Sequence, residues 1–144
     1  QAEPGGGTTD YAVEIYYNAL KYGYYECYLS EETSLPMMYM PDAIKATIGL
    51  MEAPISQIDI RSSYNVGVIS FTPKEIAASI QKYIPDFTIT YKSDFRQALA
   101  DSWPNSVDDS KARADWNWEH DFDLDRMTKD MLDNIKVKIE TEIN

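Results

Sequence analysis

The chain is organised around Pro4-Gly5-Gly6-Gly7-Thr8-Thr9-Asp10-Tyr11-Ala12, where three consecutive glycines run into two threonines and a helical pattern begins. Glycine lets the backbone adopt positive φ angles and lets a ligand approach closely. Thr9 and Asp10 are both favoured N-cap residues. Because a helix N-terminus offers unpaired N–H groups and a partial positive charge, this turn predicts a corner that binds an anion or an amino acid. The alternative is a flexible chain start followed by an ordinary helix cap.

The composition is that of one acidic domain. The 144 residues are 44% hydrophobic and carry a formal net charge of −11, which suits a domain with a core and argues against disorder. A surface of this charge repels nucleic-acid phosphates and anionic membranes, so we expect neither partner. No apolar run approaches the roughly 18 residues of a membrane span. Cys27 is the single cysteine, so we expect a reducing compartment, the cytoplasm or, in a eukaryote, the mitochondrial matrix.

Helical and extended segments alternate along the chain, which favours an α/β fold. Helices are expected over 10–22, 41–53, 73–83, 94–102, 109–116 and from Asp123 onward, and strands over 24–29, 64–69 and 87–91, with 35–40 extended. Gly23 is expected to end the first helix. The apolar face of that helix is predicted at Ala12, Ile15, Tyr16, Ala19 and Leu20. The last helix has a predicted apolar side at Leu124, Met127, Met131, Leu132, Ile135 and Ile139. The helix over 41–53 is expected to face inward through Ile44, Thr47, Ile48 and Met51. About three strands are few for a free-standing α/β domain, and the chain has no initial Met. We therefore expect a piece of a longer protein whose sheet is incomplete here.

The clearest local signature is Phe71-Thr72-Pro73-Lys74-Glu75-Ile76. Thr72 at the N-cap and Glu75 at the third helical position form a capping box, with proline as the first helical residue. Phe71 and Ile76 occupy the two positions of a hydrophobic staple. The stretch predicts a helix that begins at residue 73.

Several segments resemble the extended short-chain dehydrogenases and epimerases. Tyr64-Asn65-Val66-Gly67 followed by Phe71–Glu75 is similar to a strand–turn–helix late in that superfamily, and Tyr39–Ala43 is similar to its aromatic-x-x-Asp-Ala helix start. Within the superfamily, three segments are similar to the epimerase-like L-threonine 3-dehydrogenases: Pro4–Ala12, Leu35–Asp42 and Ser102–Ser110.

The resemblance implies that residues 1–144 are the C-terminal, substrate-binding portion of a Rossmann-type α/β fold, with few strands and about six helices. The N-terminal dinucleotide-binding part is absent. It further implies an NAD-dependent oxidoreductase that converts L-threonine to 2-amino-3-ketobutyrate, with a homodimer as a candidate assembly. In the family, a Tyr-x-x-x-Lys pair and a glycine-rich fingerprint supply catalysis and NAD binding. Both lie upstream of this chain, so the resemblance implies no catalytic residue here, NAD held mainly by the missing part, and no activity alone.

Four residues match the family's substrate contacts. Gly7, Thr8 and Thr9 correspond to its Gly-Thr-Thr turn, whose hydroxyl and free N–H groups can hold the substrate carboxylate. Trp103 corresponds to a mobile tryptophan that closes over the site; the alternative for Trp103 is a core anchor beside Pro104.

One departure from the superfamily bears on the substrate. Sugar-nucleotide epimerases place an Arg just before the aromatic-x-x-Asp segment, whereas Ser34–Met38 holds no cation here. A diphosphate would be poorly held without one, so a small amino acid is the better fit.

Three further patterns are interpreted as structural. Tyr17 and Lys21 satisfy Tyr-x-x-x-Lys but lack its context, which predicts a solvated or packing pair. Asp121–Asp125 imitates the start of a calcium loop, yet Arg126 stands where glycine is required, so a helix-capping acidic cluster is expected. His120 is the only histidine beside the single cysteine, and we expect no metal site.

Two other functions stay open on the sequence. One is a related epimerase or reductase that acts on another small substrate. The other is a non-catalytic acidic α/β module that docks on a partner through an unpaired sheet edge.

Overall fold

The computed structural model describes residues 5–67 and 69–142; Pro4 and Val68, which belong to two of the segments discussed above, lie outside that range. The elements in chain order are α1 (Tyr11–Tyr22), β1 (Tyr24–Cys27), β2 (Leu35–Met37), α2 (Met40–Glu52), the 3-10 turn η1 (Ile55–Gln57), β3 (Ile69–Phe71), α3 (Pro73–Gln81), β4 (Thr88–Tyr91), α4 (Phe95–Asp101), α5 (Ser110–Trp116) and α6 (Leu124–Glu142). The expected α/β class with six α-helices and few strands is confirmed for the described residues.

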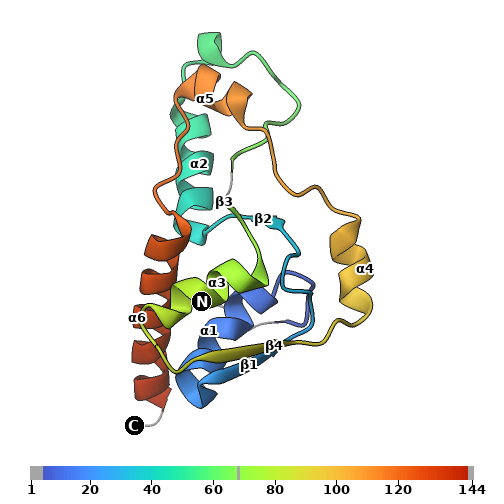
Figure 1. Ribbon diagram of the computed structural model, residues 1–144. Coiled ribbons are helices and arrows are strands. Elements are labelled where there is room, and N and C mark those ends of the chain that lie inside the picture. The colour runs from blue at the N-terminus through green and yellow to red at the C-terminus, as the bar shows by residue number, and fades with distance from the viewer. Residues whose placement is uncertain (1–4, 68, 143–144) are drawn as a thin grey trace.

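The main core lies between the β1–β4 ribbon and three helices, α1, α3 and α6, which contact one another (Figure 1). The predicted face of α1 is buried through Ile15, Tyr16 and Ala19. The glycine after α1, Gly23, takes the left-handed conformation with φ 65° and ends the helix as expected. On α6 the apolar side predicted from residue 124 onward is buried at Met127, Met131, Leu132 and Ile135.

The four strands form two separate ribbons. β1 pairs with β4 in parallel, from Tyr24 opposite Thr88 to Cys27 opposite Tyr91. β2 pairs with β3 antiparallel, from Leu35 opposite Phe71 to Met37 opposite Ile69. A parallel pair of strands needs a long crossover connection. The segment from β2 to α3 forms that connection between β1 and β4. The strand expected over 64–69 is thereby corrected: Tyr64 packs edge-on against Trp116 instead of pairing, and the strand is Ile69–Phe71.

A second, smaller core holds α2 and α5 together at the top of Figure 1. Its buried members are Ala46, Ala112 and Trp118. A Cβ on Gly67 would overlap the Asp109 carboxylate at the start of α5, so glycine allows the chain to pass close to that helix.

The orientation expected for α2 is wrong. Ile44, Ile48 and Met51 are exposed, as is Thr47, and the buried residues of the helix are Asp42 and Ala46. A helical repeat of apolar residues identifies one side of a helix but not what covers it. Here α5 and the segment that leads into α6 approach the side of α2 that carries Asp42 and Ala46. On that side, the buried carboxylate of Asp42 accepts hydrogen bonds from the N–H groups of Asp121 and Phe122 at 2.8 and 3.1 Å.

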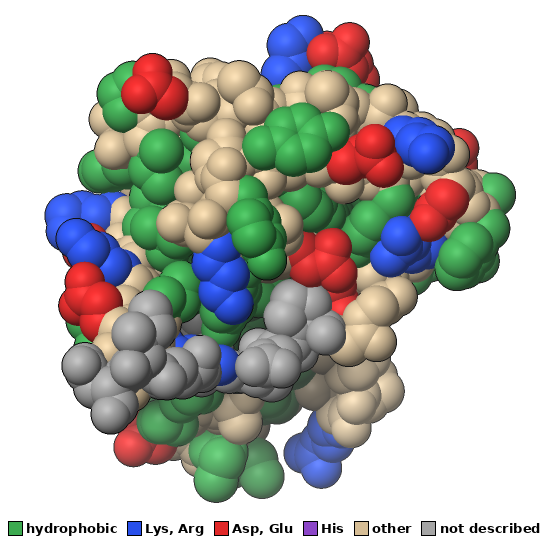
Figure 2. Space-filling model, turned by 90° about the horizontal axis from the view of Figure 1, so that it is seen from below, with side chains coloured by type: hydrophobic (Ala, Val, Ile, Leu, Met, Phe, Trp, Pro, Cys, Tyr) green, Lys and Arg blue, Asp and Glu red, His purple; other side chains and the backbone are tan. Residues whose placement is uncertain are grey.

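The surface shows no single-sign field on the face turned toward the viewer in Figure 2, where acidic, basic and hydrophobic side chains are interspersed. Within the described part of the chain, no helix is both long and apolar enough to cross a bilayer.

Candidate functional site

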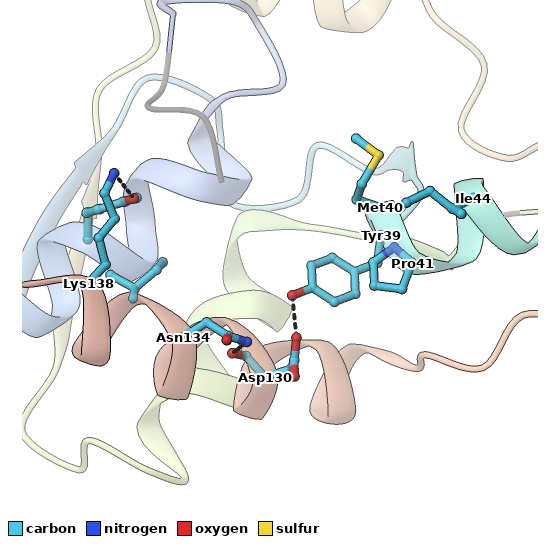
Figure 3. A pocket seen from close by; sticks show the side chains of 9 residues that line it. Tyr39, Met40, Pro41, Ile44, Asp130, Asn134 and Lys138 are labelled. Atoms are coloured by element: carbon cyan, nitrogen blue, oxygen red, sulfur yellow. Dashed lines mark hydrogen bonds between the residues drawn. The ribbon is translucent and has the colours of Figure 1, made fainter.

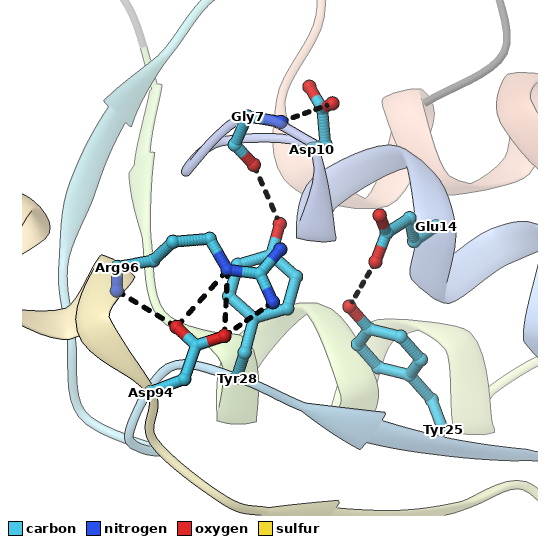
Figure 4. A network of polar contacts seen from close by, with 7 residues as sticks. All are labelled: Gly7, Asp10, Glu14, Tyr25, Tyr28, Asp94 and Arg96. Carbon is cyan, nitrogen blue, oxygen red and sulfur yellow. Dashed lines mark hydrogen bonds and ion pairs between the residues drawn. The ribbon is translucent and has the colours of Figure 1, made fainter. Parts of the chain in front are cut away.

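The glycine turn is closed by its own aspartate. Asp10 stands at the N-cap position of α1 but makes no capping hydrogen bond with its side chain. Its Oδ2 atom instead accepts hydrogen bonds from the N–H groups of Gly5 at 2.7 Å and Gly7 at 2.8 Å (Figure 4). Gly6 between them has φ 89°, a conformation that favours glycine. The expectation of free N–H groups at Gly5 and Gly7 is therefore corrected: both already bind a carboxylate.

The carbonyl side of the same turn is tied to α4. The Tyr28 hydroxyl donates to the Gly7 carbonyl at 2.9 Å. The Arg96 guanidinium lies 3.1 Å from the centre of the Tyr28 ring and pairs with Asp94 at 2.6 Å (Figure 4). Hydrogen bonding to Arg96 lowers the pKa of Asp94, while burial raises the pKa of Tyr28. The start of α4 is thus linked to Gly7 through the stacked pair of Arg96 and Tyr28.

An apolar pocket of about 310 Å³ opens beside the turn. Thr9 and Asp10 line it from the start of α1, and Phe71 lines it from β3. Ala12 and Val13 line it from α1. The remaining lining residues come from the β2–α2 segment and from α6 and are mostly methionines: Met37, Met38, Tyr39, Met40, Met127 and Met131. No Lys or Arg is among these described lining residues. The pocket offers a hydroxyl and a carboxylate at one end of a pliable apolar wall.

The structure brings together three of the four expected site residues. Gly7, Thr8 and Thr9 form the turn, with Thr8 buried and Thr9 at the pocket. Trp103 lies after α4 and does not line this pocket. Its side chain is 42% exposed, so the alternative of a core anchor beside Pro104 is wrong. The α4 helix that leads to it is held by Gln97, whose Oε1 accepts from the Ser30 N–H at 2.8 Å.

The structural interpretations of Tyr17 and of the acidic run agree with the geometry. Tyr17 packs under the exposed Lys21, 5.7 Å from ring centre to Nζ, and its hydroxyl accepts from Lys138 Nζ at 3.3 Å. Asp123 caps α6 by accepting from the Arg126 N–H at 2.8 Å.

The neighbouring carboxylates pair separately, Asp121 with Lys45 at 2.7 Å and Asp125 with Lys82 at 2.5 Å. In the described ranges no group of three or more His, Cys, Asp or Glu residues is arranged to hold a metal ion.

The sequence patterns did not reveal two features of the site region. The sequence pattern predicts a capping role for Asp10, whereas its carboxylate organises the turn and the residue lines the pocket. The methionines of Leu35–Met40 were seen only as an extended apolar segment. The clustering of methionine on both Leu35–Met40 and α6 is a signal that could have paired the two segments.

The sequence of this chain is similar to known dehydrogenases and epimerases. No family model matches the chain. The chain is 54% identical over 132 residues to the mitochondrial L-threonine 3-dehydrogenase of Sus scrofa, covering 91% of this chain and 35% of that protein. It is 48% identical over 142 residues to an uncharacterised epimerase/dehydratase of Staphylococcus saprophyticus, covering 98% of this chain and 44% of that protein.

The crystal structure of L-threonine dehydrogenase from Phytophthora infestans superposes with a TM-score of 0.93 at 59% identity, over 96% of this chain and 45% of that one. The chain therefore spans less than half the length of each of these relatives. The fold and the sequence similarity together define this chain as a homologue of the epimerase-like dehydrogenases of the extended short-chain type. More narrowly, it is homologous to part of the L-threonine 3-dehydrogenases, as the resemblance predicted.

Proposed function

We propose that this chain is the substrate-binding part of an NAD-dependent L-threonine 3-dehydrogenase, which oxidises L-threonine to 2-amino-3-ketobutyrate, and that it is inactive alone. The observation that carries the proposal is the pocket at the Gly7–Asp10 turn, in a chain 59% identical to the threonine dehydrogenase of Phytophthora infestans. The proposed setting is the cytoplasm or mitochondrial matrix, which is supported by the free, buried Cys27 and by the mitochondrial relative.

The pocket suits a small amino acid. L-Threonine carries an ammonium group, a carboxylate, a hydroxyl and one methyl group. Asp10 can accept hydrogen bonds from the ammonium group, and the Thr9 hydroxyl can donate to the carboxylate. Met37 and Met38 provide an apolar wall for the methyl group. A nucleotide-sugar diphosphate lacks a cation here to bind it, which supports the amino acid over the sugar nucleotide.

The other three matched residues have proposed roles around Thr9 and Asp10. Gly7 holds the turn through its N–H to Asp10 and its carbonyl to Tyr28. Thr8 sits buried between Gly7 and Thr9 and fixes the direction of the turn. Trp103 follows α4, which is tied to the turn through Arg96, and we assign it to covering the bound amino acid.

The described residues carry no glycine-rich dinucleotide fingerprint. No Gly-x-Gly-x-x-Gly occurs in the sequence, and Gly5–Gly7 follow no strand within the described residues. The N–H groups of Gly5 and Gly7 that could cradle a phosphate already bind Asp10. NAD, which accepts the hydride in this reaction, is therefore assigned to the rest of a longer protein, and this chain binds, orients and encloses the amino acid.

A related epimerase or reductase acting on another small substrate is the second candidate. The Staphylococcus saprophyticus relative, named an epimerase/dehydratase, is the observation in its favour. An epimerase returns the hydride to its own substrate and a reductase consumes NADH, so net NADH formation from L-threonine separates the two candidates.

The test uses a chimera in which this chain replaces the matching part of the Phytophthora infestans enzyme. L-Threonine should reduce NAD, seen as NADH absorbance, with the chimera and not with the 144-residue chain alone. Thr9→Val in the chimera should raise the KM for threonine and leave NAD binding unchanged, because valine keeps the shape and lacks the hydroxyl. An unchanged KM would refute the role of Thr9, and a chimera silent toward threonine would refute the function.

A further inference from the structure

The glycine turn needs support from outside itself to keep a single conformation. Gly5, Gly6 and Gly7 are consecutive, and glycine has more backbone freedom to lose on folding than any other residue. The Asp10 carboxylate fixes the N–H side of the turn. The carbonyl of Gly7 belongs to the planar peptide that joins Gly7 to Thr8, so whatever holds that oxygen also orients the threonines that follow.

Tyr28 holds this carbonyl from a position 21 residues further along the chain. Its hydroxyl donates to the Gly7 oxygen at 2.9 Å, and the Asp10 N–H donates to the same oxygen at 3.1 Å. Both bonds form at once because a carbonyl oxygen has two lone pairs. Tyr28 is only 7% exposed, so packing around its ring keeps the hydroxyl in place. The two bonds together fix the plane of the peptide between Gly7 and Thr8.

Arg96, at the start of α4, holds the Tyr28 ring (Figure 4). Its guanidinium lies 3.1 Å from the ring centre, and its side chain is only 19% exposed. Asp94 accepts hydrogen bonds from Nε of Arg96 at 3.0 Å and from Nη2 at 2.6 Å, which keeps the guanidinium over the ring. A cation in this position is attracted by the ring electrons and, by drawing them toward itself, strengthens the hydroxyl as a hydrogen-bond donor.

We propose that Tyr28 and Arg96 are positioning residues for the amino-acid pocket: Tyr28 orients the turn over residues 7–9, and Arg96 acts through Tyr28. Neither residue lines the pocket, so both act without touching the ligand. Thr9, which lines the pocket, binds well only if the turn places its hydroxyl correctly, since a small misplacement of a binding group is costly. The identity of the ligand, L-threonine, rests on the proposed function.

The first experiment measures threonine kinetics in the chimera described above. Tyr28→Phe keeps the ring under Arg96 and removes the hydroxyl from Gly7. The KM for L-threonine should rise roughly threefold to tenfold, the effect of one hydrogen bond, while kcat and NAD binding stay unchanged. A variant that only destabilises the fold lowers the fraction of active protein, and so lowers the apparent kcat without changing the KM. An unchanged KM would overturn the proposal.

Tyr25→Phe is the matched control for the lost hydroxyl. Tyr25 is 5% exposed, and its hydroxyl donates at 2.8 Å to Glu14 of α1, outside the turn (Figure 4). The KM of this variant should equal that of the parent chimera. An equal rise in KM in both variants would show that the loss of any buried tyrosine hydroxyl has the same effect, and would overturn the role of Tyr28.

The second experiment asks whether Arg96 acts through Tyr28. Arg96→Met removes the cation and keeps an apolar side chain beside the ring, so the KM for threonine should rise roughly threefold. The same substitution in the Tyr28→Phe chimera should have almost no further effect, because the hydroxyl that Arg96 supports is already gone. Effects on KM that multiply in the double variant would overturn the assignment of Arg96.

Lys138→Met is the matched control for removing a cation from a tyrosine. Lys138 Nζ lies 5.5 Å from the centre of the Tyr17 ring and donates to its hydroxyl at 3.3 Å. This pair belongs to a groove between α6 and the start of α2, which Asp130 and Ile44 also line (Figure 3). Lys138 does not line the pocket at the turn, so the KM should stay at the parent value. A rise equal to that of Arg96→Met would overturn a specific role for Arg96.

A measurement without catalysis separates this proposal from the proposed function. Hydrogen exchange read by mass spectrometry in the ligand-free chimera reports how often the turn over residues 5–10 opens. Exchange there should accelerate roughly threefold or more in Tyr28→Phe, and not in Tyr25→Phe, because the turn loses one of its hydrogen bonds. Faster exchange in a chimera that does not oxidise threonine would support the positioning roles and refute the proposed function. Unchanged exchange in an active chimera would overturn the positioning roles and leave the proposed function intact.

Discussion

Asp10 controls the chemistry of the glycine turn at the scale of one residue. Its carboxylate binds two glycine N–H groups and lines the pocket. The turn therefore presents a negative charge where a bare helix N-terminus would present a positive one. This favours a ligand with an ammonium group over a simple anion, because a second carboxylate or phosphate would be repelled.

Asp10→Asn in the chimera tests that charge. Asparagine keeps the size of the side chain and loses its negative charge, so the KM for threonine should rise tenfold or more if a charge-assisted hydrogen bond of roughly 1.5–3 kcal/mol is lost. Steady-state kinetics gives the KM, and NAD titration by fluorescence should be unchanged. A normal KM would mean that the ammonium group binds elsewhere.

Asp42 is the second residue whose role only contacts reveal. It is 3% exposed, and its carboxylate binds the N–H groups of Asp121 and Phe122 ahead of α6. This explains why the aromatic-x-x-Asp segment needs an acid there: the side chain joins α2 to the start of α6.

Asp42→Asn should lower the free energy of unfolding by roughly 1.5–3 kcal/mol, because the amide loses one acceptor and the charge. Urea unfolding of the 144-residue chain measures this. The exposed Asp86→Asn is the control and should stay within about 0.5 kcal/mol of the parent. Equal losses in both variants would show that charge number, not the pair of hydrogen bonds, is responsible.

At the scale of one element, α3 is the helix that local chemistry predicts best. The Glu75 N–H donates to Thr72 Oγ1 at 3.2 Å, and the Thr72 N–H donates to Glu75 Oε2 at 2.8 Å. The staple residues Phe71 and Ile76 are both buried. All these contacts lie within six residues, so the sequence pattern contains the whole interaction.

Thr72→Ala should cost about 1 kcal/mol of stability, since the alanine leaves the start of α3 uncapped. Thermal unfolding followed by circular dichroism gives the change. Thr47→Ala is the control: Thr47 is an exposed residue inside α2 whose hydroxyl bonds only its own helix, to the Ala43 carbonyl at 2.9 Å. Matching losses in the two variants would argue against the capping box.

At the scale of the whole molecule, acidic side chains paired with cations determine how stability depends on pH. The pKa of Asp125 is lowered by hydrogen bonding to Lys82, that of Asp121 by Lys45 and that of Asp94 by Arg96. A carboxyl whose pKa is lower in the folded chain stabilises it above the unfolded pKa, about 3.9. That contribution is lost as the pH falls through the folded pKa.

Stability should therefore be nearly flat from neutral pH to about pH 5 and fall below about pH 4. Urea midpoints measured across this range test the prediction. Lys82→Met should weaken the acid dependence, because Asp125 then loses the main cause of its lowered pKa. A midpoint that rises on acidification would contradict it.

The local elements could be predicted from the sequence because their causes are local. The periodicity of α1, the capping box of α3 and Asp123 at the start of α6 each involve residues within a few positions, and all three are confirmed. The similarity to threonine dehydrogenases was also visible in short segments.

The tertiary structure alone decided which sides of these elements are covered and which groups meet. It turned the apolar side of α2 outward, brought Met37 of β2 to Met127 of α6 around one pocket, and gave Asp10 to glycine N–H groups instead of a cap. The first two depend on packing between segments up to about a hundred residues apart, and a pattern within one segment carries no information about its neighbour in space. The Asp10 contacts span only three and five residues, but they depend on the backbone path of the glycine turn, which the flexibility of glycine leaves open.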